Sequence, residues 1–109
     1  MIHLDKTTDT ILRGKITITQ MKQGYRYGFD AVCLAAFVNG YLRKNKKDLS
    51  LADVGSGVGT ISLILALKNK NLKISSIENN EEFIEIAKEN VLKNKFHNTI
   101  KTVNYDIFN

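Results

Sequence analysis

A short run of residues that ends in three alternating glycines restricts the fold of this chain more than any other feature. The run at 49–54 is mostly apolar and contains Asp53, and Gly55, Gly57 and Gly59 follow it at every second position. Glycine has no Cβ and adopts backbone dihedrals that other residues avoid, so a turn built from glycines lets the backbone approach a ligand closely. The pattern predicts a strand, a tight turn and a helix start, with a nucleotide-like ligand held at the turn.

Further strand and helix patterns follow this turn. An apolar run at 61–67 predicts a helix, and residues 72–77 predict a second strand. Asn80 is a suitable N-cap for the next helix, whose apolar residues recur at helical spacing, and residues 99–105 alternate as a third strand. The order strand, helix, strand, helix, strand is typical of a parallel sheet with right-handed crossovers. The expected fold class is therefore α/β.

The segment 1–48 precedes this unit, and residues 49–109 contain it. Alternating β-branched residues on both sides of an Arg-Gly pair predict a hairpin within residues 8–20, which would serve as a lid or a docking edge. Residues 21–30 form an aromatic and glycine-rich loop that fits two roles equally well, covering the core or contacting a ligand. Asp30 is expected to be the N-cap of a helix over residues 31–42.

Composition places the chain among globular proteins. It has 109 residues, of which 43% are hydrophobic and 25% charged, so a disordered or fibrous class is not indicated. The net charge of +5 would suit a polyanionic partner such as RNA, but the lysine-rich run at 43–47 is more typical of a solvated connection. The chain shows no metal-ligand spacing, no export signal and no stretch long and apolar enough to span a membrane.

The single cysteine, Cys33, excludes a disulfide within the chain. A reducing cytoplasm is the simplest location for such a protein. Because Cys33 lies among alanine, valine and leucine residues, we expect a small buried hydrophobic side chain and not a nucleophile.

Acidic residues stand at the ends of all three strands predicted after residue 48. These residues are Asp53, Glu78 and Asp106. Ligands bind beyond the carboxyl ends of the strands in an open parallel sheet, so the three side chains are expected to share one site. Glu78 lies nineteen residues after Gly59, close to the spacing at which an acid accepts hydrogen bonds from ribose hydroxyls. Asp106 is suited to accept one from the exocyclic amine of adenine.

The glycine spacing discriminates between nucleotide cofactors. A dinucleotide fingerprint requires G-x-G-x-x-G, whereas this turn has G-x-G-x-G, and the Gly-Lys-Ser/Thr of a P-loop does not follow. Asp53 is a poor neighbour for a pyrophosphate but a good one for an ammonium group. A nucleoside that carries an amino acid fits better, and S-adenosylmethionine has that form.

The same stretches resemble a known family. Asp-Val-Gly-Ser-Gly-Val-Gly at 53–59 resembles motif I of class I S-adenosylmethionine-dependent methyltransferases, and the strand ends at 77–79 and 104–106 resemble their next two cofactor contacts. The segment at 20–37, with Gly-Tyr-Arg-Tyr-Gly-Phe-Asp at 24–30, is similar to the N-terminal signature of the tRNA1(Val) adenine-N6 methyltransferase family. The resemblance implies a Rossmann-like parallel sheet, the βαβαβ half of the class I fold, preceded by a hairpin and a helix.

The resemblance also implies a reaction and a set of cofactor contacts. The reaction would transfer a methyl group from S-adenosylmethionine to the exocyclic nitrogen of an adenine in tRNA. Asp53 and the glycines would hold the methionine end, Glu78 the ribose and Asp106 the adenine, while Arg26 and Asp30 would lie in the segment that closes over the cofactor. The implied cofactor-binding residues are Arg26, Asp30, Asp53, Gly55, Ser56, Gly57, Gly59, Glu78, Asn79 and Asp106.

The chain departs from the family pattern on the acceptor side. Members of the family carry an Asn-Pro-Pro-aromatic motif after the fourth strand, which holds the target amine and stacks the flipped base. This sequence contains no proline and stops at Asn109. We therefore expect an incomplete cofactor-binding half, either a truncated piece or a naturally shortened gene product, that is inactive alone and has no assigned catalytic residue. An exposed strand edge would favour homo-oligomers or aggregation.

Two alternative functions fit the same residues. One is a methyltransferase that acts on another substrate, such as a protein glutamine or a small molecule. The other is a non-catalytic module that binds S-adenosylmethionine weakly or serves as a surface for RNA or protein.

Overall fold

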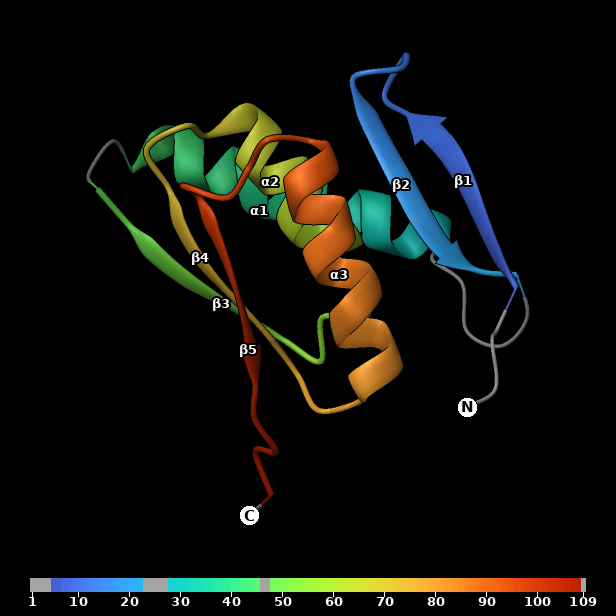
Figure 1. The fold of residues 1–109 in the computed structure, drawn as a ribbon. Helices are drawn as coiled ribbons and strands as arrows, with labels where there is room; N and C mark the ends of the chain where they lie inside the picture. The colour runs from blue at the N-terminus through green and yellow to red at the C-terminus, as the bar shows by residue number, and fades with distance from the viewer. Residues whose placement is uncertain (1–4, 23–27, 46–47, 109) are drawn as a thin grey trace.

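The computed structural model describes residues 5–22, 28–45 and 48–108, which form two sheets and three helices (Figure 1). The elements follow the chain in the order β1 (Lys6–Ile11), β2 (Ile16–Met21), α1 (Phe29–Lys44), β3 (Ser50–Val54), α2 (Thr60–Lys68), β4 (Lys73–Glu78), α3 (Glu81–Lys93) and β5 (Ile100–Asn104). The predicted hairpin and the predicted β-α-β-α-β order are confirmed. The turn of the hairpin includes Arg13 and Gly14, both with positive φ.

The three later strands form a parallel sheet in the order β3-β4-β5. The register pairs Leu51 with Ile74 and Ile74 with Ile100, so one apolar row crosses all three strands. Helices α2 and α3 pack against this sheet. Because the strands are parallel, their carboxyl ends lie at one edge, and the α/β fold class predicted from the sequence is confirmed.

Helix α2 is the centre of the core. Its residues from Ser62 to Ala66 are all buried, because the sheet lies on one side and α1 and β2 contact it from others. Leu63 and Leu65 are each 1% exposed. A helix enclosed on several sides has no polar face, which explains why the run at 61–67 is apolar nearly all round.

The hairpin is packed against the helices as a second layer. In Figure 1 it lies on the opposite side of α3 from the parallel sheet, and Ile16 and Ile18 of β2 are fully buried. Two asparagines, Asn90 of α3 and its C-cap Asn94, bond the backbone of β2. Asn94 Oδ1 accepts from the Thr17 N–H at 2.8 Å, and Asn90 Oδ1 accepts from the Thr19 N–H at 2.8 Å. Side chains thus satisfy strand groups that would otherwise be open to another chain.

The predicted N-cap of α1 is wrong. The helix begins at Phe29, its N-cap is Gly28, and no side-chain capping bond to it is formed among the described residues. Asp30 lies in the first turn instead, where a carboxylate still interacts favourably with the helix dipole. Its Oδ1 would be only 2.8 Å from a Cβ at position 28, so the carboxylate occupies the space that glycine leaves free.

The expected burial of Cys33 is also wrong, because its side chain is exposed. Helix α1 packs mainly on α2 through one face that carries Ala31, Ala35 and Leu42. Cys33 and the exposed Phe37, which is 78% accessible, fall outside that face. Local composition therefore indicated a helix correctly but did not indicate how much of it is covered. In the part of the chain that the structure describes, no helix is long and apolar enough to cross a membrane.

The central position of α2 leads to a stability prediction. Leu63→Ala removes a buried side chain from the core, and we expect it to lower the free energy of unfolding by about 2–5 kcal/mol. Leu92→Ala is the matched control, because Leu92 is 66% exposed on α3 and its truncation should change stability by about 0.5 kcal/mol or less. Urea unfolding of both variants measures the difference. Equal losses in the two variants would contradict the assignment of α2 to the core.

Candidate functional site

The glycine turn between β3 and α2 has a backbone that other residues rarely adopt. Gly55, Gly57 and Gly59 have φ angles of 70°, 58° and 93°. Side chains with a Cβ are strained in this left-handed region, which is the physical reason for glycine at alternate positions. The turn lies at the carboxyl edge of the parallel sheet, where the sequence predicted a ligand site.

Three successive amides of this turn are already bonded within the protein. The N–H groups of Gly55 and Ser56 donate to the carbonyl of Ile77 at 2.8 and 3.0 Å, and the Gly57 N–H donates to Glu78 Oε1 at 3.0 Å. A glycine loop that cradles phosphate uses free amides for that purpose. The observed bonds therefore argue against a phosphate cradle, in agreement with the argument from glycine spacing.

The carboxylate of Glu78 joins the turn to the start of α3. Oε1 accepts from Gly57, while Oε2 accepts from the N–H groups of Asn79 at 3.0 Å and Asn80 at 2.9 Å. Asn80 is the N-cap of α3 as predicted, because its side chain accepts from Glu82 and Phe83. A carboxylate has about four acceptor sites, so three internal bonds orient Glu78 and leave it capacity for one donor of a ligand.

Asp53 is a partly buried acid at the end of β3. Burial raises the pKa of its carboxyl above the usual range, although the hydrogen bonds from Ser62 oppose this shift. The Ser62 hydroxyl donates to Asp53 Oδ2 at 2.7 Å. A carboxylate in such surroundings gains strongly from a cation, because a neighbouring positive charge compensates the cost of its desolvation.

Two hollows flank the glycine turn and share Gly55. The first has a volume of about 70 Å³ and is lined by Ala31, Asp53, Gly55, Ser56, Gly57, Val58, Thr60, Ile61 and Phe83. The second has a volume of about 150 Å³ and is lined by Val54, Gly55, Ile77, Glu78, Asn79, Tyr105, Asp106, Ile107 and Phe108. One acid lies in the first hollow and two lie in the second, so the structure separates the three strand-end acids into two groups.

The sequence-predicted residues divide in the same way. Asp53, Ser56 and Gly57 line the first hollow, and Gly55 lies between the two hollows. The second hollow contains the remaining members of the strand-end set, which are Glu78, Asn79 and Asp106. Asp106 Oδ1 accepts from the Phe108 N–H at 2.9 Å, which folds the residues after β5 back toward the acid.

Three predicted residues occupy other positions. Gly59 is buried at the start of α2, where an added Cβ would lie 3.9 Å from that of Ala87. Asp30 is exposed, and its neighbour Ala31 lines the first hollow. Arg26 lies outside the described residues, as does the rest of 23–27 in the loop at 21–30, whose role the sequence left open.

Several lining residues were not singled out by the sequence. Phe83 of α3 reaches the first hollow, and Tyr105, Ile107 and Phe108 provide an apolar wall for the second. Tyr105 is 55% exposed and Phe108 is 91% exposed. Large apolar side chains on both sides of Asp106 in the sequence are the signal that indicates such a wall, since an exposed cluster of this kind marks a binding surface more often than a core.

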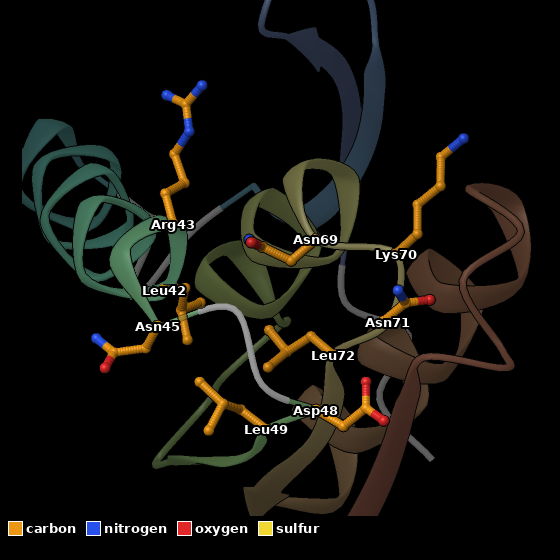
Figure 2. Close-up of a pocket in the computed structure, with 9 residues that line it drawn as sticks. All are labelled: Leu42, Arg43, Asn45, Asp48, Leu49, Asn69, Lys70, Asn71 and Leu72. Carbon is orange, nitrogen blue, oxygen red and sulfur yellow. The ribbon is translucent and has the colours of Figure 1, made fainter.

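A larger hollow of about 280 Å³ lies at the opposite end of the sheet, before β3 and β4 (Figure 2). Leu42, Leu49 and Leu72 point toward one another there, whereas Arg43 and Lys70 extend away from them. The amide of Asn69 at its rim bonds the Leu65 carbonyl and Asn39. This hollow is larger than the two at the glycine turn but does not bring charged groups together, so the carboxyl edge remains the candidate site.

Comparisons with known proteins relate the chain to methyltransferases. Over 92 residues the chain is 30% identical to a tRNA1(Val) (adenine(37)-N6)-methyltransferase of a Flavobacteriaceae bacterium, covering 84% of this chain and 38% of that protein. Over 42 residues it is 52% identical to a release factor glutamine methyltransferase of Bacillus cereus, covering 38% of this chain and 15% of that protein. The chain thus spans well under half of the length of either relative.

A solved structure shows the same fold. The S-adenosylmethionine-dependent methyltransferase of Agrobacterium tumefaciens superposes with a TM-score of 0.76 at 13% identity, over 97% of this chain and 34% of that one. The methyltransferase small domain family matches residues 35–109, which include the glycine turn and all three strand-end acids. This match extends over more than half of the sequence, so the chain belongs to the methyltransferase small domain family.

Proposed function

We propose that the two hollows bind S-adenosylmethionine across Gly55, with its amino-acid end at Asp53 and its nucleoside at Glu78 and Asp106. The observation that carries this proposal is the division of the acids between two hollows that share one glycine. A molecule with an ammonium group at one end and a ribose and adenine at the other matches that division. The turn between them offers a glycine backbone without side chains, so a ligand can lie close against it.

Each end of the site has matching chemistry. Asp53 supplies a desolvated negative charge for the ammonium, and Glu78 is held by three backbone amides in a fixed orientation for a ribose hydroxyl. Tyr105 and Phe108 supply an apolar wall for a flat base beside Asp106. Asp30 and Arg26 belong to this proposal as residues of the segment that closes over the cofactor, and residues 49–109 form its cofactor-binding part.

We further propose that the methyl acceptor is the exocyclic N6 of an adenine in tRNA. When bound, S-adenosylmethionine supplies an electrophilic methyl group, and the chain's own residues orient it for in-line attack. The relative with the longer match, the tRNA1(Val) (adenine(37)-N6)-methyltransferase, supports an RNA acceptor. Its match extends over 92 residues, or 84% of the chain, and must include part of residues 1–48, because residues 49–109 number only 61. The net charge of +5 favours the same polyanionic partner.

A protein glutamine is the second candidate acceptor. The identity of 52% to a release factor glutamine methyltransferase favours it, but that likeness covers only 38% of the chain. Homo-oligomers through the free edge of β3, a cytoplasmic location and inactivity of the 109 residues alone remain predictions. A non-catalytic module that binds the cofactor is the remaining alternative, and the acceptor experiment below separates it from an enzyme.

Calorimetric titration of the 109-residue chain with S-adenosylmethionine tests the cofactor site. We expect saturable binding that Glu78→Ala weakens by about tenfold or more, because a charge-assisted hydrogen bond is lost. Glu81→Ala is the matched control, since this exposed glutamate lies in the first turn of α3 and does not line either hollow. Equal heats for the wild type and Glu78→Ala would refute the ribose assignment.

The raised pKa of Asp53 predicts a pH dependence of cofactor affinity. As the pH falls through this pKa, the carboxyl takes up a proton and loses the charge that holds the ammonium, so affinity should decrease toward acid. Asp53→Asn should lower the affinity for S-adenosylmethionine by about tenfold or more relative to the wild type, and it should abolish this pH dependence. Titrations at a series of pH values measure both effects.

The same shift has an opposite consequence for stability. The folded state holds the Asp53 proton more tightly than the unfolded state does, so the folded state loses stability as the pH rises through this pKa and the carboxyl ionises. Asp53→Asn is therefore expected to unfold at the same or a higher denaturant concentration at pH 7, although it binds the cofactor more weakly. A variant that loses both stability and binding would indicate a structural role instead.

The product of the whole reading frame, supplied with labelled S-adenosylmethionine, tests the acceptor. We expect label in unmodified tRNA, recovered as N6-methyladenosine after digestion, and none in a release factor. Label in glutamine would select the second candidate, and label in neither, with cofactor binding intact, would favour the non-catalytic module. An unpaired adenine should be a better acceptor than a paired one, because less energy is needed to move it out of the base stack into the site.

A further inference from the structure

Asn90 of α3 is a fully buried polar residue that the proposed cofactor contacts do not use. Its side-chain amide makes three hydrogen bonds. Oδ1 accepts from the Thr19 N–H at 2.8 Å, and Nδ2 donates to the Thr19 carbonyl at 2.8 Å and to the Val58 carbonyl at 3.0 Å. Asn90 thus joins an edge of the hairpin to the glycine turn, two parts of the chain that lie far apart in sequence.

Asn94, the C-cap of α3 four residues after Asn90, provides an internal comparison. It bonds Thr17 in the same manner, accepting from its N–H at 2.8 Å and donating to its carbonyl at 2.7 Å. Its third bond runs to the Asn90 carbonyl within the same helix at 2.7 Å. The two asparagines therefore hold the hairpin in equivalent ways, and they differ in the contact of Asn90 with the turn.

The contact with Val58 falls at a sensitive place. Val58 lies between Gly57 and Gly59, both in the left-handed region, and lines the first hollow. The bonds of the turn to Ile77 and Glu78 come from the end of β4, whereas the bond to Asn90 comes from α3. A glycine-rich segment has large conformational freedom, so loss of one of these restraints should widen its range of conformations.

We propose that Asn90 is a positioning residue that couples docking of the hairpin to the shape of the cofactor-binding turn. The hairpin then acts on cofactor affinity through Thr19, Asn90 and Val58, without touching the cofactor. Linkage is reciprocal, so cofactor binding must in turn stabilise the docked hairpin. This inference rests on the proposed function, because the turn is taken to hold S-adenosylmethionine.

Backbone amide exchange of the chain without cofactor is the first test. Asn90→Asp keeps an acceptor for the Thr19 N–H but removes the amide donor to the carbonyls of Thr19 and Val58. Asn94→Asp likewise keeps the acceptor for the Thr17 N–H and removes the donor to the carbonyls of Thr17 and Asn90. Both variants should speed exchange in β2. Asn90→Asp should also speed exchange of the turn amides by about tenfold relative to core amides of β4, against about twofold or less in Asn94→Asp. Equal acceleration of the turn in both variants would overturn the proposal.

The same pair of variants has a binding readout. Asn90→Asp should weaken S-adenosylhomocysteine binding by about tenfold in calorimetry, whereas Asn94→Asp should change it by about twofold or less. A purely structural role predicts that affinity follows the loss of stability in both variants. The coupling would be contradicted if the two variants lost affinity equally although their unfolding midpoints differed. It would also be contradicted if the two variants had the same midpoint and the same affinity.

Exchange of the wild-type chain with S-adenosylhomocysteine keeps the proposal falsifiable if Asn90→Asp does not fold. Saturating ligand should slow exchange in the glycine turn and also at Thr17 and Thr19 of the hairpin. Protection of the turn with unchanged hairpin exchange would overturn the coupling. Absence of protection in the turn itself would refute the proposed function, and the exchange comparison without cofactor would then decide the role of Asn90.

Discussion

The carboxylate of Glu78 accepts hydrogen bonds from the amides of Gly57, Asn79 and Asn80, and the carboxyl edge of the sheet depends on this arrangement. A turn with three glycines in the left-handed region needs hydrogen bonds from other elements to keep one conformation, because it has few side chains to pack and loses much backbone entropy on folding. The end of β4 supplies the missing restraints through Glu78 and the Ile77 carbonyl. The buried amide of Asn90 adds a restraint from α3.

These restraints hold the backbone of the candidate site through hydrogen bonds within the protein. The amides of Gly55, Ser56 and Gly57 are bonded internally and do not form a free amide cradle, while acids lie in the hollows on either side of Gly55. Partial burial raises the pKa of Asp53, because it disfavours the charged form of the carboxyl. Carboxyls whose pKa is shifted by burial are typical of functional sites.

Sequence patterns predicted the elements of this fold well where they depend on local periodicity. The alternation of the hairpin, the β-α-β-α-β order and the Asn80 cap are all confirmed, because each is determined by neighbouring residues. The prediction that Asp30 caps α1 is wrong because the helix begins before Asp30, at Phe29. The prediction that Cys33 is buried is wrong because only one face of α1 is covered. Boundaries and coverage depend on what packs against a helix, which spacing does not encode.

The sequence alone determined that three acids follow three parallel strands and that glycines alternate at the first of them, and strand direction then required the acids to meet at one edge. Tertiary structure decided how they are divided: Gly55 separates Asp53 from Glu78 and Asp106. It also decided that Asn90 joins β2 to the turn. Local pattern specifies backbone direction and periodicity, whereas the partner of a buried amide depends on which distant segments pack beside it.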